Sequence, residues 1–165
     1  MPYQPVINGT RYMVSAGHFL ATQAGFDILE AGGNAVDAGV AAGVALGVVH
    51  SDMVQFAGVA PIMIYMAEQD EVVTISGLGW WPKSANIDRF VKEFDGTVPI
   101  GLLRTVVPSA PDAWITALRK YGTMSFGDVA AASIRYARDG FSMHHVMRDY
   151  IVAHDDTYRK WGANA

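Results

Sequence analysis

The sequence feature that most constrains the fold is an apolar stretch rich in alanine and glycine at residues 35–49. Gly32, Gly33 and Asn34 precede it directly. Glycine often ends helices and asparagine caps them, so this pattern predicts a tight corner between a helix at 18–31 and a second at 35–49. Bilayer spans need about 20 apolar residues. We therefore interpret residues 35–49 as a buried central helix, and Asp37 as a cap partner rather than a catalyst.

The rest of the chain predicts a mixed α/β (α+β) fold. A polar stretch at 68–71 separates two β-rich runs and indicates a hairpin. Ser125 followed by Asp128 resembles a weak capping box. The predicted strands are 12–16, 59–66 and 72–76, and the further predicted helices are 88–94, 111–121, 125–138 and 144–160.

Composition excludes several classes of protein. The chain has 165 residues, 51% of them hydrophobic and 17% charged, a net charge of −4 and no cysteine. It is too apolar for a disordered chain, carries no basic cluster for nucleic acid, and has no thiolate for a disulfide, metal or nucleophile. Soluble domains carry about 25% charged residues, so part of this surface is expected to be covered by more protein. The N-terminus lacks the pattern of a signal peptide, which predicts a cytoplasmic protein not bound to membrane.

Two stretches carry motifs typical of one enzyme family. The first is Leu-Glu-Ala-Gly-Gly-Asn-Ala-Val-Asp-Ala at 29–38, preceded by a matching run at 13–22. The second includes Arg-Lys-Tyr-Gly-Thr-Met at 119–124 and Arg-Tyr-Ala-Arg-Asp-Gly-Phe at 135–141. In this order they resemble the γ-glutamyltransferase (γ-glutamyltranspeptidase) family of N-terminal nucleophile (Ntn) hydrolases. The resemblance covers roughly residues 12–145.

This resemblance implies that residues 1–165 are a single segment, the N-terminal part of the large subunit of a self-cleaving precursor. It implies part of a four-layer αββα sandwich. The nucleophile is then the N-terminal Thr of a small subunit, with its own α-amino group as base. No threonine of this chain has the family's Thr-Thr-His-like setting. We expect no catalytic residue, metal or cofactor in this chain, a small-subunit partner and a small-molecule amide substrate. Higher oligomers of such heterodimers stay open.

The chain departs from the family after the second hairpin strand. Family transpeptidases hold the donor carboxylate with an arginine there, and aligning on Gly77 places Leu78 at that position. Leucine offers no hydrogen bond, and a buried unpaired carboxylate is costly. We therefore predict that Leu78, Gly79, Trp80 and Trp81 wall an apolar acyl pocket. The alternative is that both tryptophans only fill core or interface space.

A second departure lies at residues 50–61, where the family has a glycine-rich run. Only Gly58 remains here. Gln55 and Phe56 are predicted to reach the substrate pocket and to narrow it. The alternative is a loop that simply packs differently.

Other chemistry was weighed against simpler structural explanations. His50, Ser51 and Asp52 have the residue types of a triad, but their adjacency argues against the required geometry. A second group contains metal-ligand types without a His-x-x-x-His pair, so we expect a solvated helix face: His144, His145, His154, Asp155 and Asp156. Arg104 is expected to form a surface ion pair rather than to bind an anionic substrate.

Three functions remain in order of preference. The first is an amidohydrolase or acylase that uses the missing small subunit. The second is a true γ-glutamyl hydrolase or transferase that binds its carboxylate with another arginine. The third is a catalytically dead homologue that acts as a scaffold, which the absence of a downstream Thr-Thr-His-like site would favour.

Overall fold

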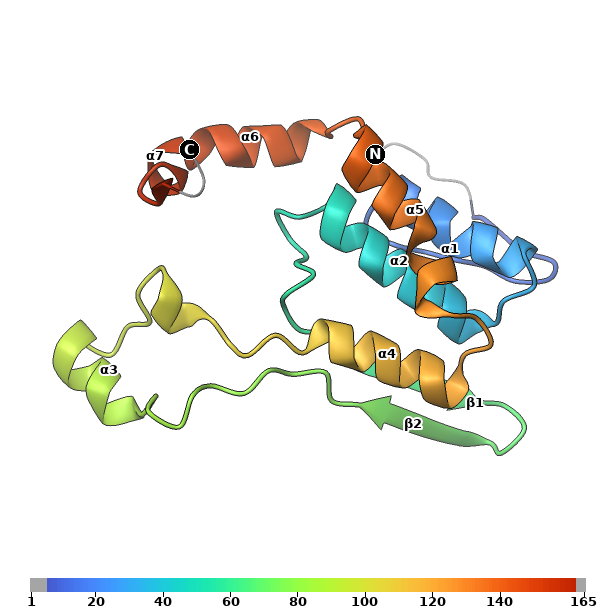
Figure 1. Ribbon diagram of the computed structural model, residues 1–165, viewed down its shortest axis with the longest axis horizontal. Helices are drawn as coiled ribbons and strands as arrows, with labels where there is room; N and C mark the ends of the chain where they lie inside the picture. The colour runs from blue at the N-terminus through green and yellow to red at the C-terminus, as the bar shows by residue number, and fades with distance from the viewer. Residues whose placement is uncertain (1–5, 163–165) are drawn as a thin grey trace. The chain divides into compact units, whose positions relative to one another are not determined.

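The computed structural model describes residues 6–162, which divide into two compact units. The first unit comprises residues up to 55 and from 118 onward, and the second comprises 56–117. Figure 1 labels the elements, which in chain order are α1 (Phe19–Glu30), α2 (Ala35–Val49), β1 (Ile62–Met66), β2 (Glu71–Ile75), α3 (Ile87–Phe94), the 3-10 turn η1 (Leu102–Arg104), α4 (Ala110–Tyr121), α5 (Phe126–Asp139), α6 (His145–Ala153) and α7 (Asp155–Tyr158).

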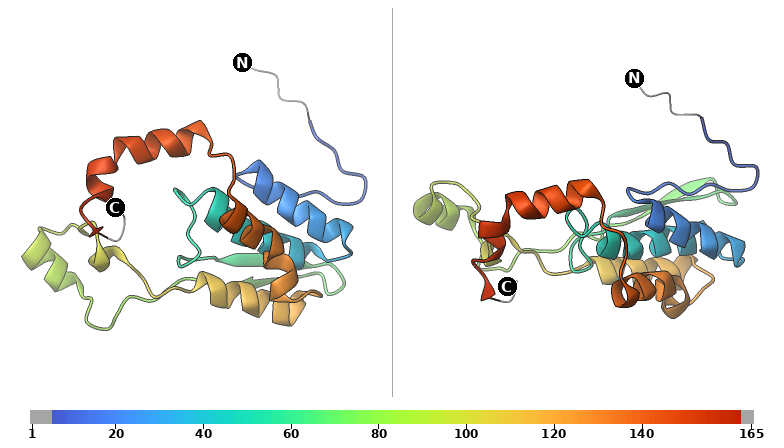
Figure 2. Two further views of the ribbon diagram at one scale, coloured as in Figure 1. Left: turned by 45° about the horizontal axis from the view of Figure 1, so that its top comes forward. Right: turned by 90° about the horizontal axis from the view of Figure 1, so that it is seen from above.

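In the first unit, α1, α2 and α5 lie side by side in every view (Figures 1 and 2). Small residues make the close approach of α1 and α2 possible. A methyl group added at Gly25 of α1 would lie 2.8 Å from the carbonyl oxygen of Ala38. The corner between the helices contains Gly32 at φ +93°, a conformation that L side chains rarely adopt. The predicted helix pair, its corner and the burial of α2 are confirmed.

Asp37 is fully buried at the N-terminal end of α2. One carboxylate oxygen accepts from the N–H of Asn34, which completes a capping box. The same carboxylate accepts from the backbone N–H groups of Thr123 and Met124 at 2.9 and 3.1 Å, and from the Thr123 hydroxyl at 2.7 Å. The carboxylate therefore ties the start of α2 to the turn that precedes α5, as a structural group rather than a catalyst.

The later helices follow their predicted caps. Ser125 and Asp128 form a complete capping box at the start of α5, and Gly140 ends this helix at φ +86°. The predicted helix at 144–160 divides at His154 into α6 and α7. The prediction of one continuous helix is therefore wrong, because His154 leaves helical geometry at φ −115°, ψ 16°.

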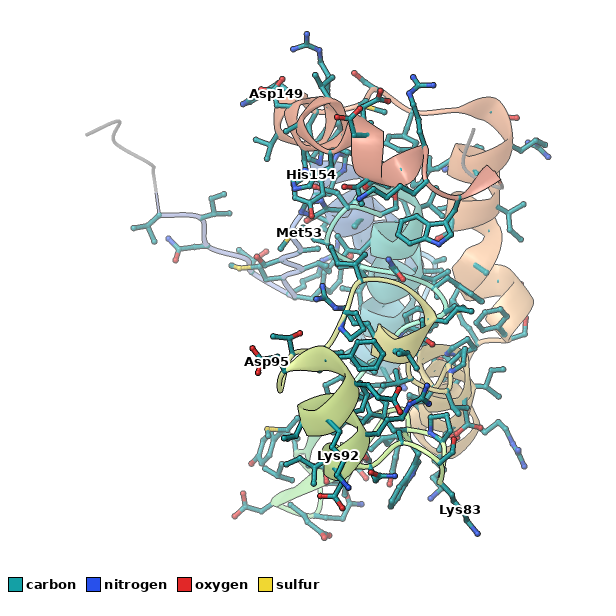
Figure 3. All side chains as sticks on the ribbon, turned by 90° about the vertical axis from the view of Figure 1, so that its left-hand side faces the viewer. Met53, Lys83, Lys92, Asp95, Asp149 and His154 are labelled. Atoms are coloured by element: carbon teal, nitrogen blue, oxygen red, sulfur yellow. The ribbon has the colours of Figure 1, made fainter. Side chains whose placement is uncertain are left out.

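The second unit is built around the predicted hairpin. Strands β1 and β2 are antiparallel, with Ile64 opposite Val73. Helix α3 is capped by Asn86 and buries Phe90, whose ring lies 5.4 Å from that of Trp81. Lys83 and Lys92 extend outward from this unit (Figure 3).

Two fold predictions have different outcomes. Residues 12–16 form no strand, although their side chains alternate between half-buried and exposed. A strand needs a hydrogen-bonded neighbour, and within residues 6–162 the only sheet is the β1–β2 hairpin. The mixed helix and strand content matches the predicted α+β class, whereas the four-layer sandwich stays a prediction. Among the described residues, no helix has the length and apolarity that a bilayer span requires.

Candidate functional site

The predicted substrate-binding strip, residues 78–81, is held by backbone hydrogen bonds at Trp80 and at the preceding Gly77 within the second unit. The carbonyl of Gly77 accepts from the N–H of Ala60, and the carbonyl of Trp80 accepts from the N–H of Val107. A methyl group at Gly79 would lie 2.0 Å from the carbonyl oxygen of Val107. Position 79 therefore requires glycine. The backbone hydrogen bonds at Gly77 and Trp80 fix the path of the strip.

The side chains of this strip differ in their surroundings. Leu78 is 55% exposed and Trp80 is 84% exposed. Trp81 lines a cavity of about 60 Å³ together with Phe90 and Arg89. Trp81 thus packs against α3 within its unit, while Trp80 presents an open aromatic face.

The other two predicted binding residues fall in different units. Phe56 belongs to the second unit and packs against Trp114, with ring centroids 5.4 Å apart. Gln55 belongs to the first unit and lines a groove of about 450 Å³. That groove is lined by Ser51, Asp52, Gln55, Met147, Ile151, Asp155 and Tyr158. The role of these residues in substrate binding stays a prediction.

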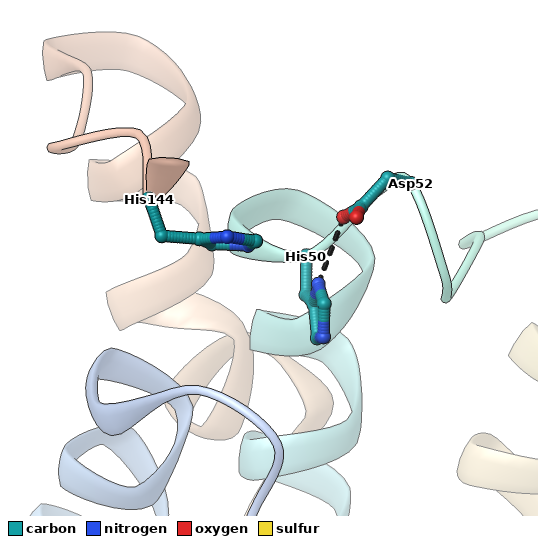
Figure 4. A group of neighbouring side chains, drawn as sticks. All are labelled: His50, Asp52 and His144. Carbon is teal, nitrogen blue, oxygen red and sulfur yellow. Dashed lines mark hydrogen bonds and ion pairs between the residues drawn. The ribbon is translucent and has the colours of Figure 1, made fainter. Parts of the chain in front are cut away.

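Three histidines meet in the first unit at a place that the sequence reasoning did not single out. His18, His50 and His144 are the cap residues of α1, α2 and α6 respectively. Their ring centroids lie 5.0 to 6.5 Å apart. His50 Nδ1 lies 2.8 Å from Asp52 Oδ1. A dashed line marks this interaction in Figure 4. We call these four residues the histidine cluster.

Hydrogen bonds assign the protons of the cluster. Nδ1 of His18 accepts from the N–H of Leu20 at 3.2 Å, and Nδ1 of His144 accepts from the N–H of Met147 at 3.1 Å. In a neutral imidazole the other nitrogen then carries the hydrogen. Both Nε2 atoms are buried without a hydrogen-bond partner among the described residues. His50 has the opposite tautomer, because its Nδ1 donates to the Asp52 carboxylate.

Electrostatics disfavour positive charge on His18. This side chain is only 6% exposed. Burial, and after it the neighbouring His144 and His50, lower the pKa of His18 below its ordinary value. His18 is therefore held in the neutral form that caps α1.

One expectation on histidine chemistry is corrected by this cluster and another is not. His50 bonds to Asp52, but no hydrogen bond joins Ser51 to His50 within residues 6–162, so the argument against a triad at these adjacent residues is not overturned. His144 is half-buried and caps α6, so it does not lie on a solvated helix face. The expectation holds for the exposed His145, His154, Asp155 and Asp156. Asp149 of the same helix also points outward, paired with Arg148 (Figure 3).

Arg104 also differs from its prediction. Its guanidinium donates to the carbonyl of Val98 at 2.8 Å, and it takes part in no ion pair of the described residues. The signal that could have located the histidine cluster is local, since a histidine is the first residue of each of the predicted helices 18–31 and 144–160, and another directly follows residue 49.

The comparisons with known proteins decide the family. The sequence model of the gamma-glutamyltranspeptidase family matches residues 21–163. The chain belongs to the gamma-glutamyltranspeptidase family. This confirms the resemblance carried by residues 29–38 and by the later motifs.

Two curated relatives and one solved structure illustrate the different proteins of the family to which this chain is similar. The chain is 36% identical over 135 residues to the glutathione hydrolase-like YwrD proenzyme of Bacillus subtilis, covering 81% of this chain and 25% of that protein. It is 35% identical over 143 residues to the acylase ACY 1 proenzyme of a Pseudomonas strain, with 81% and 25% covered. The crystal structure of Helicobacter pylori gamma-glutamyltranspeptidase matches with a TM-score of 0.88 at 27% identity, covering 97% of this chain and 47% of that one.

The chain therefore spans about a quarter of the length of these curated relatives. Similarity to a glutathione hydrolase-like protein and to an acylase is almost equal, so overall identity does not separate the two substrate classes.

Proposed function

We propose that this chain is the N-terminal part of the large subunit of a gamma-glutamyltranspeptidase-family amidohydrolase of the acylase type. In this proposal the precursor cuts itself, and the small subunit begins with a threonine. The threonine hydroxyl attacks the amide carbonyl, its own α-amino group accepts the proton, and the amine leaves as an acyl-enzyme forms. Water then hydrolyses the acyl-enzyme, or an amine accepts the acyl group. The chain supplies no nucleophile and needs its partner for activity.

The observation that carries the acylase assignment is Leu78. Hydrogen bonds at Gly77 and Trp80 fix the backbone on either side of it, and its side chain is 55% exposed. Leucine offers no donor to an α-carboxylate, whereas an arginine makes a bidentate pair with one. The exposed Trp80 beside it adds an aromatic surface that suits an apolar acyl group.

The first experiment is intact mass spectrometry with N-terminal sequencing of the purified full-length protein. A second polypeptide that begins with threonine supports a self-processed hydrolase. A single unprocessed chain contradicts the proposal and favours a scaffold.

The second experiment tests the substrate class in the processed protein. Turnover of a γ-glutamyl anilide and of aliphatic and aromatic acyl anilides is compared before and after Leu78→Arg. The proposal expects acyl turnover in the wild type, with Leu78→Arg lowering it and raising γ-glutamyl turnover at least about tenfold, since ion pairing to a carboxylate contributes about 1.5 kcal/mol or more.

The matched control is Met63→Arg, which changes an apolar residue that is 76% exposed on β1 of the same unit. It should leave both turnover rates unchanged. Strong γ-glutamyl turnover in the wild type, unaffected by Leu78→Arg, would instead identify a true γ-glutamyl hydrolase that uses another arginine.

A further inference from the structure

The histidine cluster contains residue types that bind metal ions, so its geometry can be compared with that of a metal site. One ligand atom each from His50, Asp52 and His144 lies within 4.8 Å of the others. Ligand atoms around a tetrahedral zinc ion lie about 3.4 Å apart, given Zn–N distances near 2.1 Å. This bound also admits the spacing of a zinc site, so the hydrogen bonds of the rings are needed to distinguish the two cases.

The helix caps formed by His18 and His144 argue against a metal ion in the histidine cluster. A metal binds the lone pair of Nε2, which requires the imidazole proton to sit on Nδ1. In His18 and His144 this proton would face the backbone N–H of Leu20 and of Met147, where both caps now need an acceptor. Only His50, whose Nδ1 donates to Asp52, presents a free Nε2 lone pair without loss of a cap.

Protonation has the same effect on the caps as metal binding, and it needs no extra ligand. A proton on Nδ1 of His144 removes the acceptor for Met147 and places a positive charge at the N-terminus of α6, where the helix dipole disfavours it. The same holds for His18 at the N-terminus of α1. His50 lies at the C-terminus of α2, where its Nδ1 bonds to Asp52 and it caps no helix N-terminus.

We propose that His18, His50 and His144 form an acid-sensitive clasp that holds the start of α6 against α1 and the end of α2. Near neutral pH the neutral rings of His18 and His144 cap their helices and pack against His50. Acidification turns two cap acceptors into donors and brings like charges within 5.0 to 6.5 Å of one another. The start of α6 then separates from the cluster.

Other charged groups on the packed elements are engaged elsewhere. On α5, Arg138 pairs with Asp139 and Arg135 lies over the ring of Tyr136. Asp37 lies at the opposite end of α2 and is fully hydrogen bonded.

Apart from the exposed Asp156 of α7, the remaining charged side chains on α1, α6 and α7 have partners of their own. On α1, Asp27 accepts from Gln23, and Glu30 pairs with Arg11. On α6 and α7, Arg148 pairs with Asp149, and Arg159 with Asp155. Asp52 is thus the carboxylate bonded to the cluster, and it neutralises a charge on His50 only.

Release of α6 has a consequence for the groove in this unit. One wall of that groove comes from Met147 and Ile151 of α6, and the other from Ser51, Asp52 and Gln55. Because Asp52 contributes to both the clasp and the groove, opening the clasp removes the α6 wall and exposes Asp52.

Hydrogen exchange of the full-length protein at pH 7.5 and pH 5.5 tests the clasp. After correction for intrinsic rates, we expect protection of the first turn of α6 to fall about tenfold or more, since one added proton shifts an equilibrium about tenfold per pH unit. Protection of α5, which carries no histidine, should stay constant.

His144→Asn is the informative variant, because asparagine caps helices well and does not titrate near neutral pH. It should keep α6 protected at both pH values. His145→Asn changes the exposed neighbour and should behave as the wild type.

Three results would overturn the clasp. One is equal α6 protection of the wild type at both pH values, which can be measured even if a variant does not fold. Another is an unchanged pH dependence in His144→Asn. The third is a metal effect, seen if ZnCl₂ at pH 7.5 raises α6 protection in the wild type but not in His50→Ala.

Discussion

The two ends of α2 bury polar groups in contrasting ways. At the N-terminal end, Asp37 is fully buried, and its carboxylate accepts hydrogen bonds from Asn34, Thr123 and Met124. At the C-terminal end, His50 meets His18 and His144, whose Nε2 atoms have no partner among the described residues. The buried carboxylate at one end of α2 is therefore fully hydrogen bonded, whereas two buried nitrogen atoms at the other end have no partner among the described residues.

The contrast shows that the effect of burying a polar group depends on whether the group is hydrogen bonded. A buried charge is tolerated when donors surround it, and the network then fixes one arrangement of the elements it joins. Buried groups without partners cost free energy and leave the arrangement open to a proton or a solvent molecule. We therefore expect the Asp37 end to set stability and the histidine end to set pH sensitivity.

The largest expected effect comes from Asp37→Ala. It leaves the N–H groups of Asn34, Thr123 and Met124 without their acceptor, so the free energy of unfolding should fall by about 3 kcal/mol or more. Urea unfolding of the full-length protein measures this. Asp27→Ala on the exposed face of α1 is the control and should change stability little; equal losses in the two variants would contradict the contrast.

Two glycine substitutions are expected to change the stability of the protein in opposite directions. A methyl group at Gly122 would lie 2.6 Å from Asp37 Oδ1 and 2.9 Å from backbone atoms of Leu118, so Gly122→Ala should cost about 1–3 kcal/mol. Gly39 in α2 has open space around it, so Gly39→Ala should stabilise the protein by about 0.5–1 kcal/mol. Thermal melts of both variants provide the comparison, and destabilisation by Gly39→Ala would show that the space is not open in the folded protein.

The pH dependence of stability should separate the two ends. The pKa of His18 is lowered in the folded state, chiefly by burial, so its contribution is complete above about pH 6.5 and falls as the pH drops below that value. Burial raises the pKa of Asp37, but hydrogen bonds from Thr123, Asn34 and Met124 outweigh it and lower the pKa overall. The contribution of Asp37 is therefore complete above about pH 3.9 and is lost as the pH falls through its lower folded pKa.

Urea unfolding across pH 3–8 checks both windows. Each group contributes a slope of at most about 1.4 kcal/mol per pH unit. His18→Asn should flatten the curve below pH 6.5, and Asp37→Asn should flatten it below pH 3.9. The assignment fails if either variant flattens the other window instead.

The smallest loss of stability is expected from Asp52→Asn. Asparagine can still accept from His50 Nδ1, so only the charge assistance of this 2.8 Å bond is lost, at about 1 kcal/mol. The urea midpoint at pH 7.5 measures it, and Asp156→Asn in the exposed α7 serves as control. A loss as large as that of Asp37→Ala would place the histidine end among the main determinants of stability.

Local signals determined the helices well because caps and periodicity act within a few residues. The start of α2 follows from Asn34 and Asp37, and that of α5 follows from Ser125 and Asp128. The predicted strand at 12–16 failed for a non-local reason, since a strand exists only where a second one pairs with it. The family could also be recognised from the sequence, because each of its motifs, at 29–38 and within 119–141, is a continuous run of residues.

The sequence by itself determined the family, the cap residues and the departure at Leu78. The tertiary structure alone decided which distant groups meet: Asp37 bonds to Thr123, 86 positions away, and His18 meets His50 and His144. It also assigned Gln55 and Phe56 to different units. The physical reason is that periodicity and capping are short-range. Contacts between distant residues depend instead on how helices pack, and the small side chains of α1 and α2 set how closely those two approach.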